Sequence, residues 1–245
     1  TFIHKWTRLC DKKLHRLVAY VNQSLGDVQV GFIGDDAKDL YLAAYSDADF
    51  AGDRKDRRST SGVLIALAGP CSFYPLAALS RKQGCVSNST AEAEIVALNS
   101  CVRTLGIPLL DLWELLLGRG MKLLALEDNQ ATLRIVKSGK FQALRHVERC
   151  HGVQLTWLYD TWKRGIYKLE DCHTDTQAAD IFTKYFSNPD KWDHAVSLIG
   201  IIRVKSGNEN TSSTHSTSSV PQPSTAQASH RACVARLPFS TAAGD

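Results

Sequence analysis

The stretch LYLAAYSDADFAGDRKDRRSTSGVLIALAGPCSFYPLAAL, residues 40–79, contains the pattern that decides the fold class. It holds three apolar runs of strand length, at 40–46, 63–67 and 72–79. A polar, basic turn separates the first two runs, and Gly69-Pro70 separates the last two. Short connections of this kind favour neighbouring antiparallel strands, so the stretch predicts a three-stranded meander.

The chain after residue 80 alternates between helical and strand patterns. Ser89 and Thr90 offer an N-cap for a first helix, and Gly106 and Pro108 are expected to end it. This alternation after a meander predicts an α/β fold, a mixed five-stranded sheet in the order βββαβαβα, flanked by helices. The expected helices are 89–105, 109–117, 130–137, 147–163 and 176–186, with a further turn or two at 192–199, and the later strands are 122–126 and 167–172.

Composition divides the chain into an N-terminal segment at 1–39, a main domain at 40–200 and a tail at 201–245. The tail is rich in Ser and Thr and cannot bury enough apolar surface to fold, so we expect it to be disordered. Apolar residues at helical spacing from Cys10 to Val21 predict an amphipathic helix in the N-terminal segment. That helix is basic, which suits either a phosphate-bearing partner or a solvated face.

The overall composition excludes several classes of protein. Hydrophobic residues make up 44% of the 245 residues, which excludes a wholly disordered chain, and a net charge of +4 is too small to indicate a nucleic-acid partner. No uninterrupted apolar run approaches the roughly 18–20 residues of a membrane-spanning helix, so no membrane partner is expected. Because residue 1 is Thr rather than Met, we expect the chain to be part of a longer protein.

The seven cysteines favour reduced thiols in a reducing compartment. Their number is odd and no CxxC pair occurs, which argues against a disulfide framework. Cys150 and Cys172, with His146, His151 and His173, could be imagined as a zinc site, but they lack the close ligand pairs of such sites. Ordinary thiols and surface histidines are the better interpretation.

Four carboxylates stand where a folded chain could bring them together. Asp47 ends the first strand and Asp128 ends the central one, and sites in α/β sheets form at the carboxyl ends of strands. Glu94 lies on the edge of the apolar stripe of the first helix, whereas Glu92 faces roughly 200° away from it. Asp180 lies among small alanines that allow close backbone approach. Taken alone, Asp47 and Asp128 are each better explained as turn formers than as ligands, and Glu92 is explained as a charge at the helix N-terminus.

Carboxylates that pack together repel one another and need a compensating cation. Ligand sets made only of oxygen suit Mg²⁺ or Mn²⁺. Two such ions would activate water and stabilise the leaving oxygen in phosphodiester cleavage. Convergence of the four acids would therefore indicate a phosphodiester hydrolase, although the spacing in the sequence does not establish that convergence.

Six blocks of the sequence carry a family resemblance: YSDADFAGDRKDRRSTSG at 45–62, SRKQ at 80–83, STAEAEIVAL at 89–98, EDNQATL at 127–133, RHVERCHGV at 145–153 and TQAADIFTK at 176–184. In this order they resemble the ribonuclease H domain of copia-type retrotransposon Pol polyproteins. The resemblance implies a ribonuclease-H-like fold and a metal-dependent endonuclease that hydrolyses the RNA strand of RNA/DNA hybrids during reverse transcription. The N-terminal segment more loosely resembles the end of a reverse transcriptase, which implies such a domain in cis. The implied location is intracellular, in a cytoplasmic particle or the nucleus.

The resemblance assigns the four acids to two ions, Mg²⁺ or Mn²⁺. Asp47 matches the aspartate that bridges both ions, Glu94 and Asp128 match the residues that complete one metal site, and Asp180 matches the residue that helps to hold the other ion. His173 is the nearest counterpart of a histidine that many cellular ribonucleases H place before the last aspartate.

Substrate contacts are implied for four polar residues, although helix capping or turn formation explains each of them equally well. No Lys/Arg-rich protrusion follows the first long helix, so basic residues of the first turn are candidates for gripping the hybrid. An alternative function is a catalytically silent module that serves as a structural or hybrid-binding part of a polyprotein. The polar residues are Ser89, Thr90, Asn129 and Gln130, and the basic ones are Arg54, Arg57 and Arg58.

Overall fold

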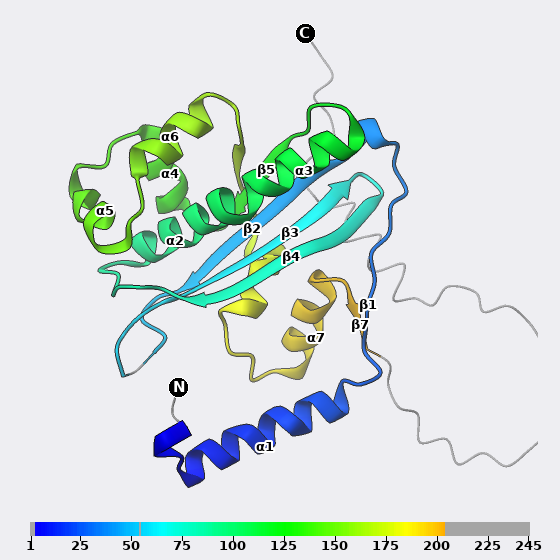
Figure 1. Cartoon of the computed structure of the whole chain (residues 1–245), viewed down its shortest axis with the longest axis vertical. Helices are drawn as coiled ribbons and strands as arrows, with labels where there is room; N and C mark the ends of the chain where they lie inside the picture. The colour runs from blue at the N-terminus through cyan, green and yellow to red at the C-terminus, as the bar shows by residue number, and fades with distance from the viewer. Residues whose placement is uncertain (1–2, 54, 204–245) are drawn as a thin grey trace, which may run out of the picture.

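The computed structural model describes residues 3–53 and 55–203, and it is built around a five-stranded mixed sheet of order β4-β3-β2-β5-β6 (Figure 1). The first three strands form an antiparallel meander, and β5 and β6 run parallel to β2. The predicted fold class is therefore confirmed. Arg54 and the part of the predicted tail at 204–245 lie outside the described residues. The strands are β2 (Tyr41–Asp49), β3 (Thr60–Gly69), β4 (Ser72–Lys82), β5 (Leu123–Glu127) and β6 (Lys168–Asp171).

Both faces of the central strands are buried, because each face packs against its own layer. Alternate residues of β2 and β3 belong to two separate core clusters, as a period of two requires. Leu42 and Ile65 pack toward the helical layer, whereas Tyr45 and Leu64 pack toward the C-terminal segment. The helical layer contains α2 (Thr90–Asn99), α3 (Ile107–Leu117), α4 (Gln130–Ser138) and α6 (Leu155–Lys163), and the other face is covered by the turn Ala178–Phe182 and α7 (Pro189–Leu198).

The long helix after the meander does not end where the sequence predicted. A π-helical turn, Ser100–Gly106, joins α2 to α3, so the prediction that Gly106 and Pro108 break the helix is wrong. Pro108 lies in the first turn of α3, where proline is tolerated. A Cβ on Gly106 would lie 3.0 Å from a methyl group of Leu123, so glycine serves close packing against β5 here.

The continuous helical stretch Thr90–Leu117 is long and apolar enough, by length and composition, to cross a membrane. A buried core helix meets the same criterion, and one such helix is weak evidence of a membrane. Most side chains of α2 are buried against the sheet, as expected of a core helix.

Two further predicted helices differ from the structure. The helix expected at 147–163 is two helices, α5 (Arg145–His151) and α6, because Gly152 adopts φ 66° and ends the first of them. The helix expected at 176–186 is instead a pair of 3-10 turns, Thr174–Thr176 and Ala178–Phe182. Between them Gln177 is fully buried, and its amide donates a 2.9 Å hydrogen bond to the Ser46 carbonyl of β2. This tertiary bond holds the chain in turns rather than in a regular helix.

The segment before β2 pairs with the last described strand, across the boundaries predicted at 39 and 201. Strand β1 (Val28–Gln29) pairs antiparallel with β7 (Ile201–Ile202), which lies inside the range predicted as tail. Phe32 also bridges to Phe73 of β4. Short 3-10 turns complete the described elements at Ile3–Lys5, Ala37–Asp39 and Gln142–Leu144.

Helix α1 (Arg8–Gln23) confirms the helix predicted near the N-terminus, yet none of its residues is buried. Its apolar stripe is exposed, with Leu17 at 58% and Leu14 at 47%. The helix lies beside α7, where the rings of Tyr20 and Trp192 meet edge to face with centroids 6.1 Å apart (Figure 1).

Candidate active site

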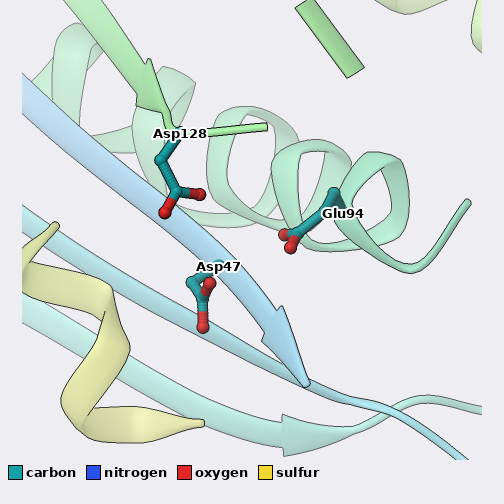
Figure 2. Close-up of side chains that lie close together, drawn as sticks. All are labelled: Asp47, Glu94 and Asp128. Carbon is teal, nitrogen blue, oxygen red and sulfur yellow. The ribbon is translucent and has the colours of Figure 1, made fainter. Parts of the chain in front are cut away.

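Three of the four predicted acids converge at one end of the sheet (Figure 2). Asp47 comes from β2, Asp128 directly follows β5, and Glu94 comes from α2. One carboxylate oxygen from each residue lies within 4.8 Å of those of the other two. Because β2 and β5 run parallel with Tyr45 opposite Leu126, the register brings Asp47 and Asp128 side by side.

The start of α2 aims Glu94 into this cluster and Glu92 away from it. Ser89 caps the helix by accepting a hydrogen bond from the Glu92 N–H, which sets the position of the first turn. Glu94 is 4% exposed, and its Oε2 has no hydrogen-bond partner among the described residues. Glu92 instead contacts His146 and His151 at 3.1 and 3.2 Å, so the two glutamates face different sides as their spacing predicted.

Asp180 reaches the site from the opposite face of the sheet, but it lies outside the three-acid cluster. It belongs to the turn Ala178–Phe182, which packs on β3. Its Oδ1 is 2.6 Å from the Lys184 ammonium, which also lies 3.5 Å from Oδ1 of Asp47. Thr183 donates a short hydrogen bond to Oδ2 of Asp47.

Thr183 and Lys184 were missed by the sequence reasoning, although they lie in the quoted block TQAADIFTK. The available signal was a basic residue four positions after Asp180, a spacing that brings side chains together on a helical turn. The contact of both residues with Asp47 could not be foreseen, because Asp47 is more than a hundred residues away in the sequence.

Glu127 is a third residue that the sequence reasoning missed. It is the last residue of β5, immediately before Asp128, and it is 0% exposed. Its Oε2 accepts a 3.0 Å hydrogen bond from Ser46 Oγ, and its Oε1 accepts one of 3.3 Å from the Asn129 N–H. Glu127 therefore joins the residue before Asp47 to the residue after Asp128. A glutamate ending the apolar run LLALE was the only sequence signal.

The electrostatics of the site are those of an acid cluster short of positive charge. Burial, followed by repulsion from neighbouring carboxylates, raises the pKa of Glu94 far above its usual range, and burial does the same to Glu127. Burial also raises the pKa of Asp47, against the opposing effects of Thr183 and Lys184. The pKa of Asp180 rises to about 6, mainly through burial. The crowded carboxylates and the unpartnered Oε2 of Glu94 fit a divalent cation with oxygen ligands.

Three of the four predicted polar substrate-binding residues form side-chain hydrogen bonds within the described part of the chain. Asn129 caps α4 by accepting from the Ala131 and Thr132 N–H groups, and Gln130 donates to Asp171. Ser89 caps α2, whereas Thr90 is exposed. The capping explanation therefore holds structurally for Ser89 and Asn129, and it leaves any contact with substrate as a prediction.

The basic loop between β2 and β3 is exposed and internally tied. Arg57 is exposed and adopts φ 57°, and Arg58 lies 3.8 Å from Asp56. Lys82 of β4 pairs with both Asp53 and Asp56, at 2.5 and 2.7 Å, which anchors the loop beside the end of β2. Of the three predicted arginines of this loop, the structure therefore places Arg57 and Arg58 on an exposed surface.

Among the described residues, the histidines and cysteines do not gather into a group that could hold a metal ion. His173 is exposed, and its Nδ1 accepts from the Asp175 N–H, so it caps a turn. Its neighbour Thr174 donates to Oδ2 of Asp128 at 3.2 Å. Every cysteine among the described residues is free, as expected of reduced thiols.

We expect Glu127→Gln to stabilise the metal-free protein at high pH. The raised pKa of Glu127 means that the native state binds the proton of this carboxyl more tightly than the unfolded chain does. The stability that the wild type gains from protonated Glu127 is therefore complete below about pH 4 and is lost as the pH rises. Glutamine cannot ionise, and its amide oxygen can still accept from the Asn129 N–H while its NH2 group donates to Ser46 Oγ. Thermal unfolding in EDTA should show a melting temperature roughly 2–8 °C above wild type at pH 8 and little difference near pH 4.

Glu148→Gln is the matched control, because Glu148 is an exposed residue of α5. The melting temperature of this variant should equal that of wild type at both pH values. A Glu127→Gln protein that is less stable than wild type at pH 8 would show that the ionised carboxylate is the stabilising form.

Comparison with known proteins finds relatives that match different lengths of the chain. No family model matches. The Pol polyprotein from transposon TNT 1-94 of Nicotiana tabacum is 26% identical over 194 residues, 76% of this chain and 13% of that protein. The Pol polyprotein from transposon RE1 of Arabidopsis thaliana is 36% identical over 93 residues, 38% of this chain and 6% of that protein. Both of these relatives are retrovirus-related Pol polyproteins. The chain spans about an eighth or less of the length of these two polyproteins.

A shorter match accompanies the Pol polyproteins. Secreted RxLR effector protein 161 of Plasmopara viticola is 45% identical over 62 residues, 25% of this chain and 41% of that protein.

Among solved structures, LC11-RNase H1 from a compost metagenome aligns with a TM-score of 0.41 and 14% identity, over 58% of this chain and 92% of that one. RNase H1 of Halobacterium salinarum aligns with a TM-score of 0.40 and 13% identity, over 58% of this chain and 94% of that one.

Proposed function

We propose that this chain is a metal-dependent ribonuclease H that cuts the RNA strand of RNA/DNA hybrids during reverse transcription of a retrotransposon. The observation that carries the proposal is the convergence of Asp47, Glu94 and Asp128 within 4.8 Å at one end of the sheet. Three buried or half-buried carboxylates have no packing reason to share one point, and their mutual repulsion is relieved by a bound cation. The relatives among Pol polyproteins support the polyprotein context.

The residues of the site would hold Mg²⁺, or Mn²⁺, and orient it. Asp47, Glu94 and Asp128 would supply oxygens to one ion, and Asp47 with Asp180 would supply oxygens to a second. When bound, such ions lower the pKa of water and stabilise a leaving oxygen, which is the chemistry that phosphodiester hydrolysis needs. Thr183 orients Asp47 by donating to its Oδ2, and Glu127 holds the ends of β2 and β5 together. The site is therefore preorganised by hydrogen bonds of this chain.

The RNA/DNA hybrid would lie across the exposed end of the sheet. Thr90 and Gln130 lie at the starts of α2 and α4, and they would contact ribose 2′-hydroxyls and phosphates. A reverse transcriptase domain in cis would supply much of the remaining grip, and the exposed apolar stripe of α1 is a suitable contact for it. We also propose an intracellular location, in a cytoplasmic particle or the nucleus.

The test is a cleavage assay on matched substrates. The full chain is incubated with an end-labelled RNA/DNA hybrid, the same sequence as duplex DNA, and the same sequence as duplex RNA, with Mg²⁺, with Mn²⁺ and with EDTA. We expect cleavage of the hybrid RNA strand only, and only with a divalent ion. Hybrid binding without cleavage would favour the silent module, and cleavage of duplex DNA would contradict the substrate class.

Removal of the charge of the basic loop should weaken substrate binding without changing the chemical step. Arg57→Ala combined with Arg58→Ala is expected to raise KM for the hybrid and leave kcat unchanged. The slope of log affinity against log salt should fall by about 0.7–0.9 for each phosphate that the loop no longer neutralises. Arg164→Ala, at the exposed end of α6, is the control. An unchanged salt slope in the double variant would exclude the loop from the binding surface.

A further inference from the structure

Lys184 provides the acid cluster with a cation from the protein itself. Its ammonium lies 2.6 Å from Oδ1 of Asp180 and 3.5 Å from Oδ1 of Asp47. Asp47 is buried and Asp180 is largely buried, with side chains 2% and 13% exposed, so neither carboxylate has much water to solvate its charge. Asp180 and Lys184 are four positions apart, and the Asp180 carbonyl accepts from the Lys184 N–H at 2.8 Å, which fixes the start of the lysine side chain.

The two halves of the acid cluster differ in their access to positive charge. Among the described residues, no lysine or arginine forms a salt bridge with Glu94 or Asp128, whereas Lys184 bridges Asp47 and Asp180. The Glu94 carboxyl even retains a buried oxygen with no partner in the described part of the chain. The charges of Glu94 and Asp128 therefore need a cation from outside the protein, whereas those of Asp47 and Asp180 are already partly neutralised by Lys184.

An ammonium group and a divalent ion cannot share the Asp47–Asp180 pair. Both need the same carboxylate oxygens, and at a separation of about 4 Å a divalent ion and an ammonium repel each other strongly in a partly buried site. A second ion would have to displace Lys184, break a hydrogen bond of 2.6 Å and leave the ammonium without a carboxylate partner. The long side chain is 39% exposed, so it has room to move away when another anion attracts it.

We propose that Lys184 occupies the place of the second ion in the substrate-free protein, so that the chain binds one divalent ion, at Asp47, Glu94 and Asp128. The inference rests on the proposed metal-dependent function and adds to it a rule for metal stoichiometry. Lys184 acts as a positioning residue and a competitor for metal binding. A phosphate of the bound hybrid is the anion that would draw the Lys184 ammonium away from Asp180, which would free Asp47 and Asp180 to bind a second ion.

The test is direct measurement of Mn²⁺ binding to the full, substrate-free chain, by titration calorimetry and by the free Mn²⁺ signal in electron paramagnetic resonance. Wild type should bind one Mn²⁺ per chain at sub-millimolar concentration. Lys184→Met, which keeps the length of the side chain and removes its charge, should bind two, with the second site at least about tenfold tighter than in wild type. Lys184→Arg should restore a stoichiometry of one.

Two further variants control the measurement. Lys191→Met removes an exposed lysine of α7 and should keep a stoichiometry of one. Asp180→Asn removes a carboxylate of the second site and should keep a stoichiometry of one. Circular dichroism of each variant checks that it folds.

The outcomes separate the two proposals. Equal Mn²⁺ stoichiometry in wild type and Lys184→Met, whether one or two, would overturn the role of Lys184 and leave the ribonuclease proposal standing if the hybrid is cleaved. Absence of Mn²⁺ binding in wild type, together with absence of hybrid cleavage, would overturn the proposed function itself.

Discussion

Asp128→Asn is expected to abolish cleavage of the hybrid by the full chain, with a loss in kcat on the order of 10²- to 10³-fold or more. The Asp128 carboxylate directly follows β5, and one of its oxygens lies within 4.8 Å of carboxylate oxygens of Asp47 and Glu94. Its replacement therefore removes one negatively charged metal ligand from the three-acid cluster. The amide keeps the size of the side chain and can still accept from Thr174. The measurement is initial-rate cleavage of a labelled RNA/DNA hybrid in Mg²⁺, together with thermal unfolding.

The control for this experiment is Asp111→Asn, which changes an exposed acid of α3. It should leave both the rate and the melting temperature at wild-type values. The melting temperature of Asp128→Asn in EDTA should be equal to or above that of wild type, because one source of carboxylate repulsion is removed. Wild-type cleavage by Asp128→Asn would sink the assignment of the site.

Gly62→Ala is the second substitution for which we expect a large effect, on both stability and activity. Gly62 pairs with Asp47 across β2 and β3, and the turn that carries Asp180 packs directly on it. A Cβ at this position would lie 2.7 Å from Cγ2 of Thr183 and 2.9 Å from the Ala179 carbonyl. The turn must move away, at a cost of about 1–3 kcal/mol of stability. Displacement of the acid and of the hydrogen bond to Asp47 should lower kcat by roughly 10- to 100-fold.

Gly84→Ala is the matched control, because a Cβ there would have no neighbour within 4 Å. It should be neutral or slightly stabilising, by up to about 1 kcal/mol. Urea unfolding and hybrid cleavage of both variants make the comparison. If Gly62→Ala matches Gly84→Ala in stability and rate, the close packing of the turn on β3 is not needed for the site.

Local sequence patterns predicted the sheet well, because each strand could be recognised from its own residues. The apolar runs at 40–46, 63–67 and 72–79 coincide with parts of β2, β3 and β4, and the glycine-proline pair separates the last two as expected. The cap at Ser89 also marked the start of α2 correctly. Burial on both faces of central strands produces long apolar runs, and such runs are visible without any knowledge of distant contacts.

The errors in the helices have a common cause, which is contact with distant parts of the chain. Local rules expect Gly106 and Pro108 to end a helix, but a π-helical turn lets the chain continue while Gly106 packs against β5. Local rules also favour a helix at 176–186, but buried Gln177 bonds to the Ser46 carbonyl and holds two 3-10 turns. In both places tertiary packing overrides local propensity.

The sequence by itself determined the order of the strands along the chain, the start of α2, and which carboxylates could meet at the strand ends. Each of these depends on residues that are neighbours in the chain or on a helical or strand period. Only the tertiary structure decided that Asp180 stays outside the cluster of Asp47, Glu94 and Asp128, and that Lys184 stands between Asp180 and Asp47. It also decided that Glu127 is buried beside them. The balance of charge in the site arises from side chains brought together across the sheet, and separations of a few ångströms between such side chains are not encoded in local sequence spacing.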